Sequence, residues 1–177
     1  MTVLTAAQDV LKELGVTEPS EIDIDAIAWS LGARVKYRPL DGCEARITGN
    51  GDQAIITVNS QSSRRRKRFS VAHELGHWKY DRGWVLVCHS DEIGRAGQNY
   101  PAPERVADSY AAQLLMPAYI FDPIARSHPK ATFQTVTAIA DLFDTSITAT
   151  AIRLVELTIF CSSLSSSASA SIYTNGG

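Results

Sequence analysis

Cysteine is scarce in this sequence, with three residues among 177 and no two of them at a C-x-x-C spacing. Cys43, Cys88 and Cys161 are therefore too few and too far apart to indicate a disulfide framework or a thiolate zinc site. Because proteins of reducing compartments seldom carry disulfides, we expect a cytoplasmic protein.

Long apolar runs and an excess of either sign of charge are also lacking. No stretch approaches the roughly 18 apolar residues of a membrane-spanning helix, and the first residues lack the basic and apolar regions of a signal peptide. A net charge of −2 and a pI near 6.1 argue against a general binder of nucleic acid. We therefore expect neither a membrane nor direct nucleic-acid binding, while the oligomeric state stays open.

The residues that are present predict an α+β fold in a single domain over residues 1–160. A hydrophobic content of 45% is ordinary for a globular chain of this length. The periodicity predicts N-terminal helices at 2–31, a small antiparallel sheet at 34–59, helices at 62–80 and 103–116, and a helix-turn-helix-like pair at 131–157. Asn50-Gly51 is typical of a hairpin turn within the sheet. Residues 161–177 are rich in serine and predict a flexible tail.

The stretch His73-Glu74-Leu75-Gly76-His77 carries the clearest chemistry. Residues four apart lie on one face of a helix, so both imidazoles can reach one zinc ion. Glu74 lies about 100° around the helix, beside the metal, where a general base belongs. A shuffled chain of this composition would contain about 0.004 such strings. Gly76 costs about 1 kcal/mol in mid-helix, which indicates a close neighbouring element unless it is merely tolerated.

A catalytic zinc site needs a third protein ligand, which this motif does not supply. The metzincin pattern is excluded because Tyr80 and Gly83 stand where it requires glycine and histidine. Glu104, at the start of the next strong helix, is the better candidate. Asp108, one turn further on, can accept a hydrogen bond from a ligating histidine. Two rivals for the third ligand remain, Asp91 and Glu92.

These residues resemble the ImmA/IrrE family of bacterial metallo-endopeptidases, over about residues 5–157. In that family an arginine-phenylalanine pair leads into the H-E-x-x-H helix, as Arg68 and Phe69 do here. Asp108 stands where the family commonly has asparagine, and Tyr110 where it has phenylalanine. A later family helix of the form E-x-x-A-N-x-F-A-x-x-L-L-x-P is matched at Glu104, Ala107, Ala111, Leu114, Leu115 and Pro117.

The resemblance implies zincin-like active-site helices of the gluzincin kind. It implies one Zn²⁺ per chain held by His73, His77 and Glu104, with Glu74 as the catalytic base. It also implies a substrate, a helix-turn-helix repressor that controls a mobile element, a stress response or a toxin–antitoxin-like system. We therefore expect a zinc endopeptidase that acts in transcription regulation by cleaving such a repressor.

Two further roles remain open among several residues. An oxyanion stabiliser is required, and its candidates are Tyr80, His89, His128 and Arg153. A basic run, residues 64–68, stands just before the motif. It either contacts an acidic substrate or nucleic acid, or is simply a solvated helix start. The substrate contacts in that run would be Arg64, Arg65 and Arg66.

Two other functions compete with the peptidase. The first is a non-catalytic regulator that keeps zinc for stability, which the intact Glu74 argues against because a structural zinc has no use for a base. The second is a DNA-binding regulator that uses the 131–157 pair. From residue 132 to 156 that pair holds one basic residue, Arg153, against Asp141, Asp144 and Glu156. Because a DNA-reading helix should be electropositive, we interpret the pair as packing.

Overall fold

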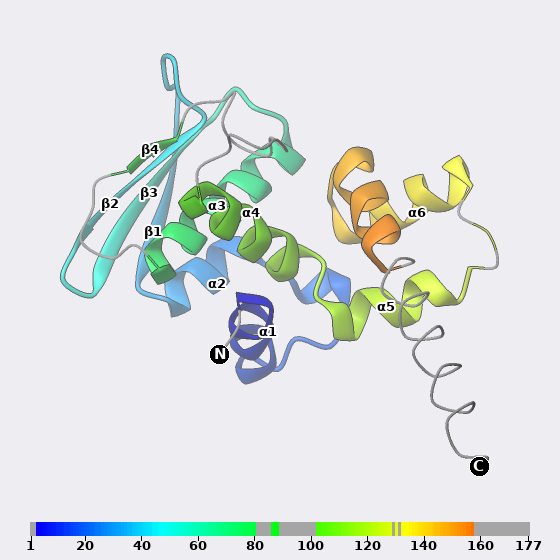
Figure 1. Ribbon diagram of the computed structural model, residues 1–177. Coiled ribbons are helices and arrows are strands. Elements are labelled where there is room, and N and C mark those ends of the chain that lie inside the picture. Colours follow the sequence, from blue (N-terminus) through cyan, green and yellow to red (C-terminus); the bar gives the residue numbers. More distant parts are fainter. Residues whose placement is uncertain (1–2, 81–85, 89–101, 129, 131, 158–177) are drawn as a thin grey trace, which may run out of the picture.

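The computed structural model describes residues 3–80, 86–88, 102–128, 130 and 132–157. The sheet and α3 lie on one side of the molecule, and α5, α6 and a last helical segment at 147–157 lie on the other (Figure 1). No helix in these ranges is long and apolar enough to cross a membrane. The elements are α1 (Val3–Glu13), the 3₁₀ helix η1 (Pro19–Glu21), α2 (Ile24–Ser30), β1 (Ala33–Arg38), β2 (Ala45–Asn50), β3 (Gln53–Asn59), α3 (Arg64–Tyr80), β4 (Leu86–Cys88), α4 (Ala102–Leu115), α5 (Ala118–Arg126) and α6 (Phe133–Phe143).

The predicted α+β class is confirmed, but the sheet is mixed, with the strand order β1-β3-β2-β4. β2 runs antiparallel to β3, as predicted, and also to the short β4. β1 runs parallel to β3, so the prediction of an antiparallel sheet is wrong for this strand. The reason is the burial of Ala54, Ile56 and Val58, which makes β3 the central strand. β3 therefore inserts between β1 and β2, although these two follow one another in the chain.

Local sequence signals set several element boundaries correctly. Asn50 pairs with Gln53 across a tight turn in which Gly51 adopts a φ of 58°, so the predicted hairpin is confirmed. Asp23 caps α2, where its carboxylate accepts hydrogen bonds from the backbone N–H groups of Asp25 and Ala26. Such caps and turns depend on neighbouring residues alone, which is why the sequence reveals them.

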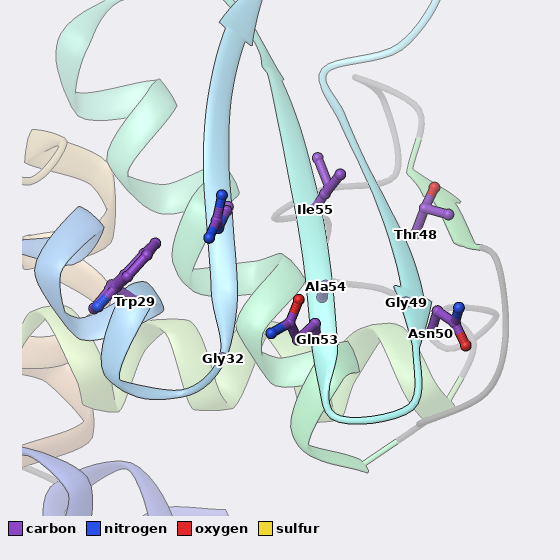
Figure 2. Close-up of a pocket in the computed structure, with 9 residues that line it drawn as sticks. Trp29, Gly32, Thr48, Gly49, Asn50, Gln53, Ala54 and Ile55 are labelled. Atoms are coloured by element: carbon purple, nitrogen blue, oxygen red, sulfur yellow. The ribbon is translucent and has the colours of Figure 1, made fainter.

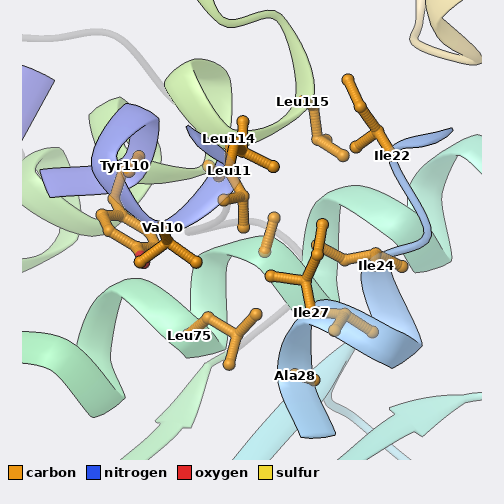
Figure 3. Packing of buried hydrophobic residues seen from close by; sticks show 14 of the residues in the cluster. Val10, Leu11, Ile22, Ile24, Ile27, Ala28, Leu75, Tyr110, Leu114 and Leu115 are labelled. Carbon is orange, nitrogen blue, oxygen red and sulfur yellow. The ribbon is translucent and has the colours of Figure 1, made fainter. Parts of the chain in front are cut away.

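The core joins α1 and α2 to the two long helices, α3 and α4 (Figure 3). Leu11 of α1, Leu75 of α3, and Tyr110 and Leu114 of α4 are all fully buried in it. α3 also packs against β2 and β3, so it lies between the sheet and α4. Each large apolar side chain contributes about 1.5–3 kcal/mol when it is buried. This core therefore fixes α3 and α4 relative to one another.

Gly76 is the point of closest approach between α3 and α4. A Cβ atom at this position would lie 2.7 Å from the Cα atom of Ala107 and 3.2 Å from its Cβ atom. The predicted close approach of a neighbouring element is thus confirmed, and the element is α4. A second glycine serves the sheet side of α3, because a Cβ atom at Gly49 would lie 2.4 Å from the ring of Trp78.

Helix α5 was not predicted, and its composition explains why. It contains Pro123, which removes a backbone donor and normally interrupts a helix. The helix forms because Pro117 starts it and because Ile120 and Phe121 are buried against the core. The predicted tail at 161–177 lies outside the described residues.

We predict that Gly76→Ala lowers the free energy of unfolding by about 1–2 kcal/mol. Alanine favours a helix by about 1 kcal/mol over glycine, but a Cβ atom 2.7 Å from a backbone atom of Ala107 places the overpacking cost in the upper part, about 2–3 kcal/mol, of the usual 1–3 kcal/mol. Urea denaturation measures the change. Ala107→Gly in the same chain should recover part of the loss, so the two substitutions should be non-additive. A Gly76→Ala variant as stable as the wild type would show that α4 does not press on this position.

Candidate metal centre

α3 presents His73 and His77 one turn apart on the face that packs against α4. Both side chains are essentially fully buried, and their rings meet edge to face with centroids 4.8 Å apart. The two Nε2 atoms are 3.1 Å apart, so they point toward a common position. The helical spacing predicted this arrangement, and the structure contains it.

Glu104, in the first turn of α4, brings a carboxylate to the same position. One of its oxygens lies 3.1 Å from His73 Nε2 and the other lies 3.3 Å from His77 Nε2. Ligand atoms at 2.0–2.1 Å from a tetrahedral zinc ion would be about 3.3–3.4 Å from one another. The observed separations are close to this spacing, and the three side chains form a group able to hold a metal ion. Two imidazoles and one carboxylate are donors that zinc commonly takes in proteins.

Asp108 lies one turn after Glu104 and contacts the other nitrogen of His73. The distance from His73 Nδ1 to the Asp108 carboxylate is 2.8 Å, a short hydrogen bond in which Nδ1–H donates. This contact leaves Nε2 directed at Glu104 and His77 and fixes the orientation of the ring. The position of Asp108 is the one that the sequence predicted for it.

The carboxylates around His73 determine its protonation in the metal-free site. Burial is the largest influence and acts to lower the pKa of His73, but hydrogen bonds to Asp108 and Glu104 outweigh it and raise the pKa to about 9. In return, hydrogen bonds from His73 and His77 lower the pKa of Glu104 to about 2. The site is therefore ionised, with a charged imidazolium held between carboxylates.

Glu74 is fully buried beside this group. Its charge contributes to the raised pKa of His73. Burying a carboxylate in a core is costly unless it is compensated by nearby charge or hydrogen bonds. Glu74 therefore belongs with the histidines to a group of buried polar side chains, and not to the apolar packing around them.

The described candidates for an oxyanion stabiliser lie in different surroundings. Tyr80, at the end of α3, is 40% exposed. Arg153 lies 4.0 Å from Asp122, and its guanidinium lies over Phe121, so it belongs to the packing of the last helix on α5. His128 is exposed after the end of α5.

Three residues named from the sequence cannot be placed in this way. The fourth oxyanion candidate, His89, lies outside the described residues. The same holds for Asp91 and Glu92, the rivals of Glu104 as the third ligand. Among the residues that the structure describes, Glu104 is the carboxylate that joins the two histidines in a group able to hold a metal.

Tyr110 contacts Tyr80 in a way that the sequence did not reveal. The Tyr110 side chain is fully buried in the core. Burial raises the pKa of the Tyr110 phenol to about 12, so it stays protonated. Its ring also meets the ring of Tyr80 edge to face, with centroids 6.0 Å apart, and no motif signals that contact.

The basic run at the start of α3 is tied to the end of α6. Arg64 lies 2.7 Å from Asp144, Arg65 pairs with both Asp141 and Asp144, and Arg68 lies 3.4 Å from Asp144. These ion pairs join segments far apart in the chain, and they give the run a packing role. Arg66 approaches Glu44 at 3.9 Å. Contact of Arg64, Arg65 and Arg66 with a substrate stays a prediction.

The chain is similar to one known family over most of its length. The family model described as Peptidase_M78, IrrE N-terminal-like domain, matches residues 28–155. No protein with a curated description matches the chain, whereas nine chains of solved structures do. One of them, a Mycobacterium tuberculosis transcriptional regulator, has a TM-score of 0.57 at 15% identity, which shows a shared fold. The match covers 85% of this chain but 45% of the regulator, so this chain spans less than half of that protein's length.

We predict that the metal-free protein loses stability as the pH rises from about 6.5 to 9. The folded state holds the His73 proton up to a pKa of about 9, whereas an exposed histidine releases it near 6.5. The folded state therefore binds more protons in this interval, and the free energy of unfolding falls by roughly 1–3 kcal/mol across it. Urea denaturation in the presence of a chelator, at several pH values, measures the decline.

His73→Gln is the test variant for this decline, and His128→Gln is its control. His73→Gln should flatten the decline, while substitution of the exposed His128 should leave it as in the wild type. Equal slopes in the wild type and in His73→Gln would assign the titration to another group.

Proposed function

The chain belongs to the M78 peptidase family, in its IrrE N-terminal-like domain, and on this premise we propose that it is a zinc-dependent endopeptidase that cleaves a helix-turn-helix repressor. The observation that carries the proposal is the convergence of His73, His77 and Glu104 from two helices onto one position. Their separations of 3.1–3.3 Å match the edge of a tetrahedral zinc site.

In the proposed site His73, His77 and Glu104 would hold the metal. Zinc, when bound there, would lower the pKa of a water molecule and polarise the scissile carbonyl. Asp108 acts through His73. Asp108 accepts a hydrogen bond from His73 Nδ1–H at 2.8 Å. This hydrogen bond keeps Nε2 free to bind the metal and makes the imidazole a stronger electron-pair donor to it.

Glu74 is the proposed general base. It takes a proton from the attacking water and later gives it to the leaving amine, a role that typically contributes a factor of about 10²–10⁴ in rate. Its burial next to the proposed ligand His73 supports this role, because it places a carboxylate beside the metal position. The alternative of a non-catalytic zinc-containing regulator leaves Glu74 unexplained.

Tyr80 is the candidate for the oxyanion stabiliser that the described contacts favour. It follows His77 by about one turn of α3, and Tyr110 holds its ring from the side. Burial raises the pKa of the Tyr80 phenol, which keeps it a hydrogen-bond donor at neutral pH.

The assignment of the substrate rests on the family resemblance, which implies a helix-turn-helix repressor as the partner. A DNA-binding function for the chain itself gains no support from the C-terminal helix pair. Asp141 and Asp144 of that pair are engaged with arginines of α3, and their negative charge opposes phosphate binding.

We predict that the purified protein contains about one zinc ion per chain and that Glu104→Ala loses most of it. Glu104 is one of the three proposed ligands, and its carboxylate contacts both histidines. Its removal therefore takes a charged ligand away from the metal position. Elemental analysis of the two proteins purified side by side gives the answer. Glu13→Ala, which alters an exposed glutamate of α1, is the control and should keep its zinc. A wild type that takes up no zinc even when it is supplied would overturn the proposal.

We predict that Glu74→Gln keeps the zinc and loses cleavage by at least about a hundredfold. Glutamine has the same shape but cannot accept the proton of the attacking water. The assay follows cleavage of candidate helix-turn-helix repressors by gel electrophoresis and mass spectrometry. Cleavage at the wild-type rate by this variant would remove Glu74 from the mechanism.

A further inference from the structure

The face of the sheet that points away from α3 is strongly cationic. Basic residues on β1 and β2 alternate with residues directed inward, and the strands β1, β2 and β3 together contain no acidic residue. All of these basic side chains are exposed. We call this surface the cationic sheet face, and its charged residues are Arg34, Lys36, Arg38 and Arg46.

These four cations differ from the basic run at the start of α3. There, Arg64, Arg65 and Arg68 form ion pairs with Asp141 and Asp144. On the cationic sheet face, none of the four makes an ion pair with any residue that the structure describes. Because the whole chain has a net charge of −2, all residues outside these four carry a net charge of −6. The surface is therefore positive on a molecule that is otherwise negative.

The same face has a hollow with aromatic and apolar surface. Its volume is about 650 Å³, and its walls include Trp29, Arg34, Thr48, Asn50, Gln53 and Ile55 (Figure 2). Trp29 is 63% exposed and Ile55 is 40% exposed. The Arg34 guanidinium lies 4.9 Å from the centroid of the Trp29 ring, which holds both side chains in place.

Protection of a sheet edge explains only part of this surface. β1 is an outer strand of the described sheet, and lysine or arginine on an edge strand discourages pairing with other chains. That function needs charge alone. It gives no reason to expose Trp29 and Ile55 beside the charges, since exposed apolar groups promote association. Tryptophan and arginine together are instead among the residue types that dominate protein–protein binding energy.

We propose that the cationic sheet face is a docking surface for an extended, acidic segment of a partner protein. Side chains at alternate positions of a strand are about 6.6–7 Å apart on one face, so Arg34, Lys36 and Arg38 match a segment with acidic residues at every second position. The hollow beside Trp29 takes an apolar or aromatic side chain of that segment. The surface is separate from the metal centre, and docking does not depend on peptidase activity.

A short acidic segment fits the charge distribution better than a nucleic acid does. Screening limits electrostatic attraction to about 8–10 Å in physiological salt, so a short segment interacts only with the charges of the cationic sheet face. A long polyanion would also meet the remainder of the molecule, which is negative. Salt should therefore weaken docking without abolishing it, because the hollow contributes apolar contact.

The test uses a fluorescein-labelled peptide of six Glu-Thr repeats followed by a phenylalanine, and the full chain carrying Glu74→Gln, with binding read by fluorescence anisotropy. We expect saturable binding that weakens with salt. The same peptide with glutamine for glutamate, or with its glutamates in one block, should bind several-fold more weakly. Arg34→Gln/Lys36→Gln should weaken binding of the alternating peptide about tenfold.

The hollow is tested separately with Trp29→Ala. This variant should weaken binding of the peptide that carries the phenylalanine, and it should bind the peptide that lacks the phenylalanine like the wild type. Equal binding of both peptides by the wild type would remove the hollow from the proposed surface.

Lys12→Gln/Lys130→Gln is the matched control, since it removes the same charge from exposed positions elsewhere and should bind like the wild type. Circular dichroism verifies that each variant is folded. Equal binding by the wild type and by Arg34→Gln/Lys36→Gln, or no preference for the glutamate peptide, would overturn the proposal. Tighter binding of an oligo-dT strand to the same face would also overturn it and make the surface a nucleic-acid site.

Discussion

The contact between α3 and α4 at Gly76 is the constraint on which the metal centre depends. Gly76 stands directly before His77 in α3, and Ala107 stands between Glu104 and Asp108 in α4. Because the two backbones meet at these small residues, short carboxylate side chains of α4 can reach imidazoles on α3. A larger side chain at either contact would widen the gap between the helices, and the ligands would separate before the helices themselves were lost.

The buried charges of the site make sense only as a group. His73, His77 and Glu74 are buried as completely as the leucines around them, and each alone would be costly in such surroundings. Together with Glu104 and Asp108 they compensate one another, which is visible in the raised pKa of His73 and the lowered pKa of Glu104. The apolar core on the other faces of the helices holds this group in position. The geometry of the candidate metal centre is thus set by the packing of the protein itself.

Features that depend on local spacing could be predicted from the sequence, whereas those that depend on distant pairing could not. The face shared by His73 and His77, the cap at Asp23 and the turn after Asn50 all follow from residues a few positions apart. Glu104 was a candidate because the motif lacks one ligand and Glu104 opens the next strong helix with Asp108 one turn further on, and the family resemblance supported this link. The parallel pairing of β1 was missed since alternation looks the same for either strand direction. The partners of the arginines in α3 were missed because they lie more than 70 positions away, and charge alone does not identify a partner.

The sheet has two faces, one that packs on α3 and one that is exposed to solvent. In β1 and β3, alternate side chains such as Ala33 and Ile56 point inward, and these residues support α3 and through it the metal centre. The residues between them in β1 face solvent, and their identity has no effect on that support. The packing of α3 on the sheet therefore explains Ala33 and Ile56 but not Arg34 and Lys36. This division allows the cationic sheet face to change without disturbance to the geometry of the candidate metal centre, because the inward and outward side chains share only a backbone.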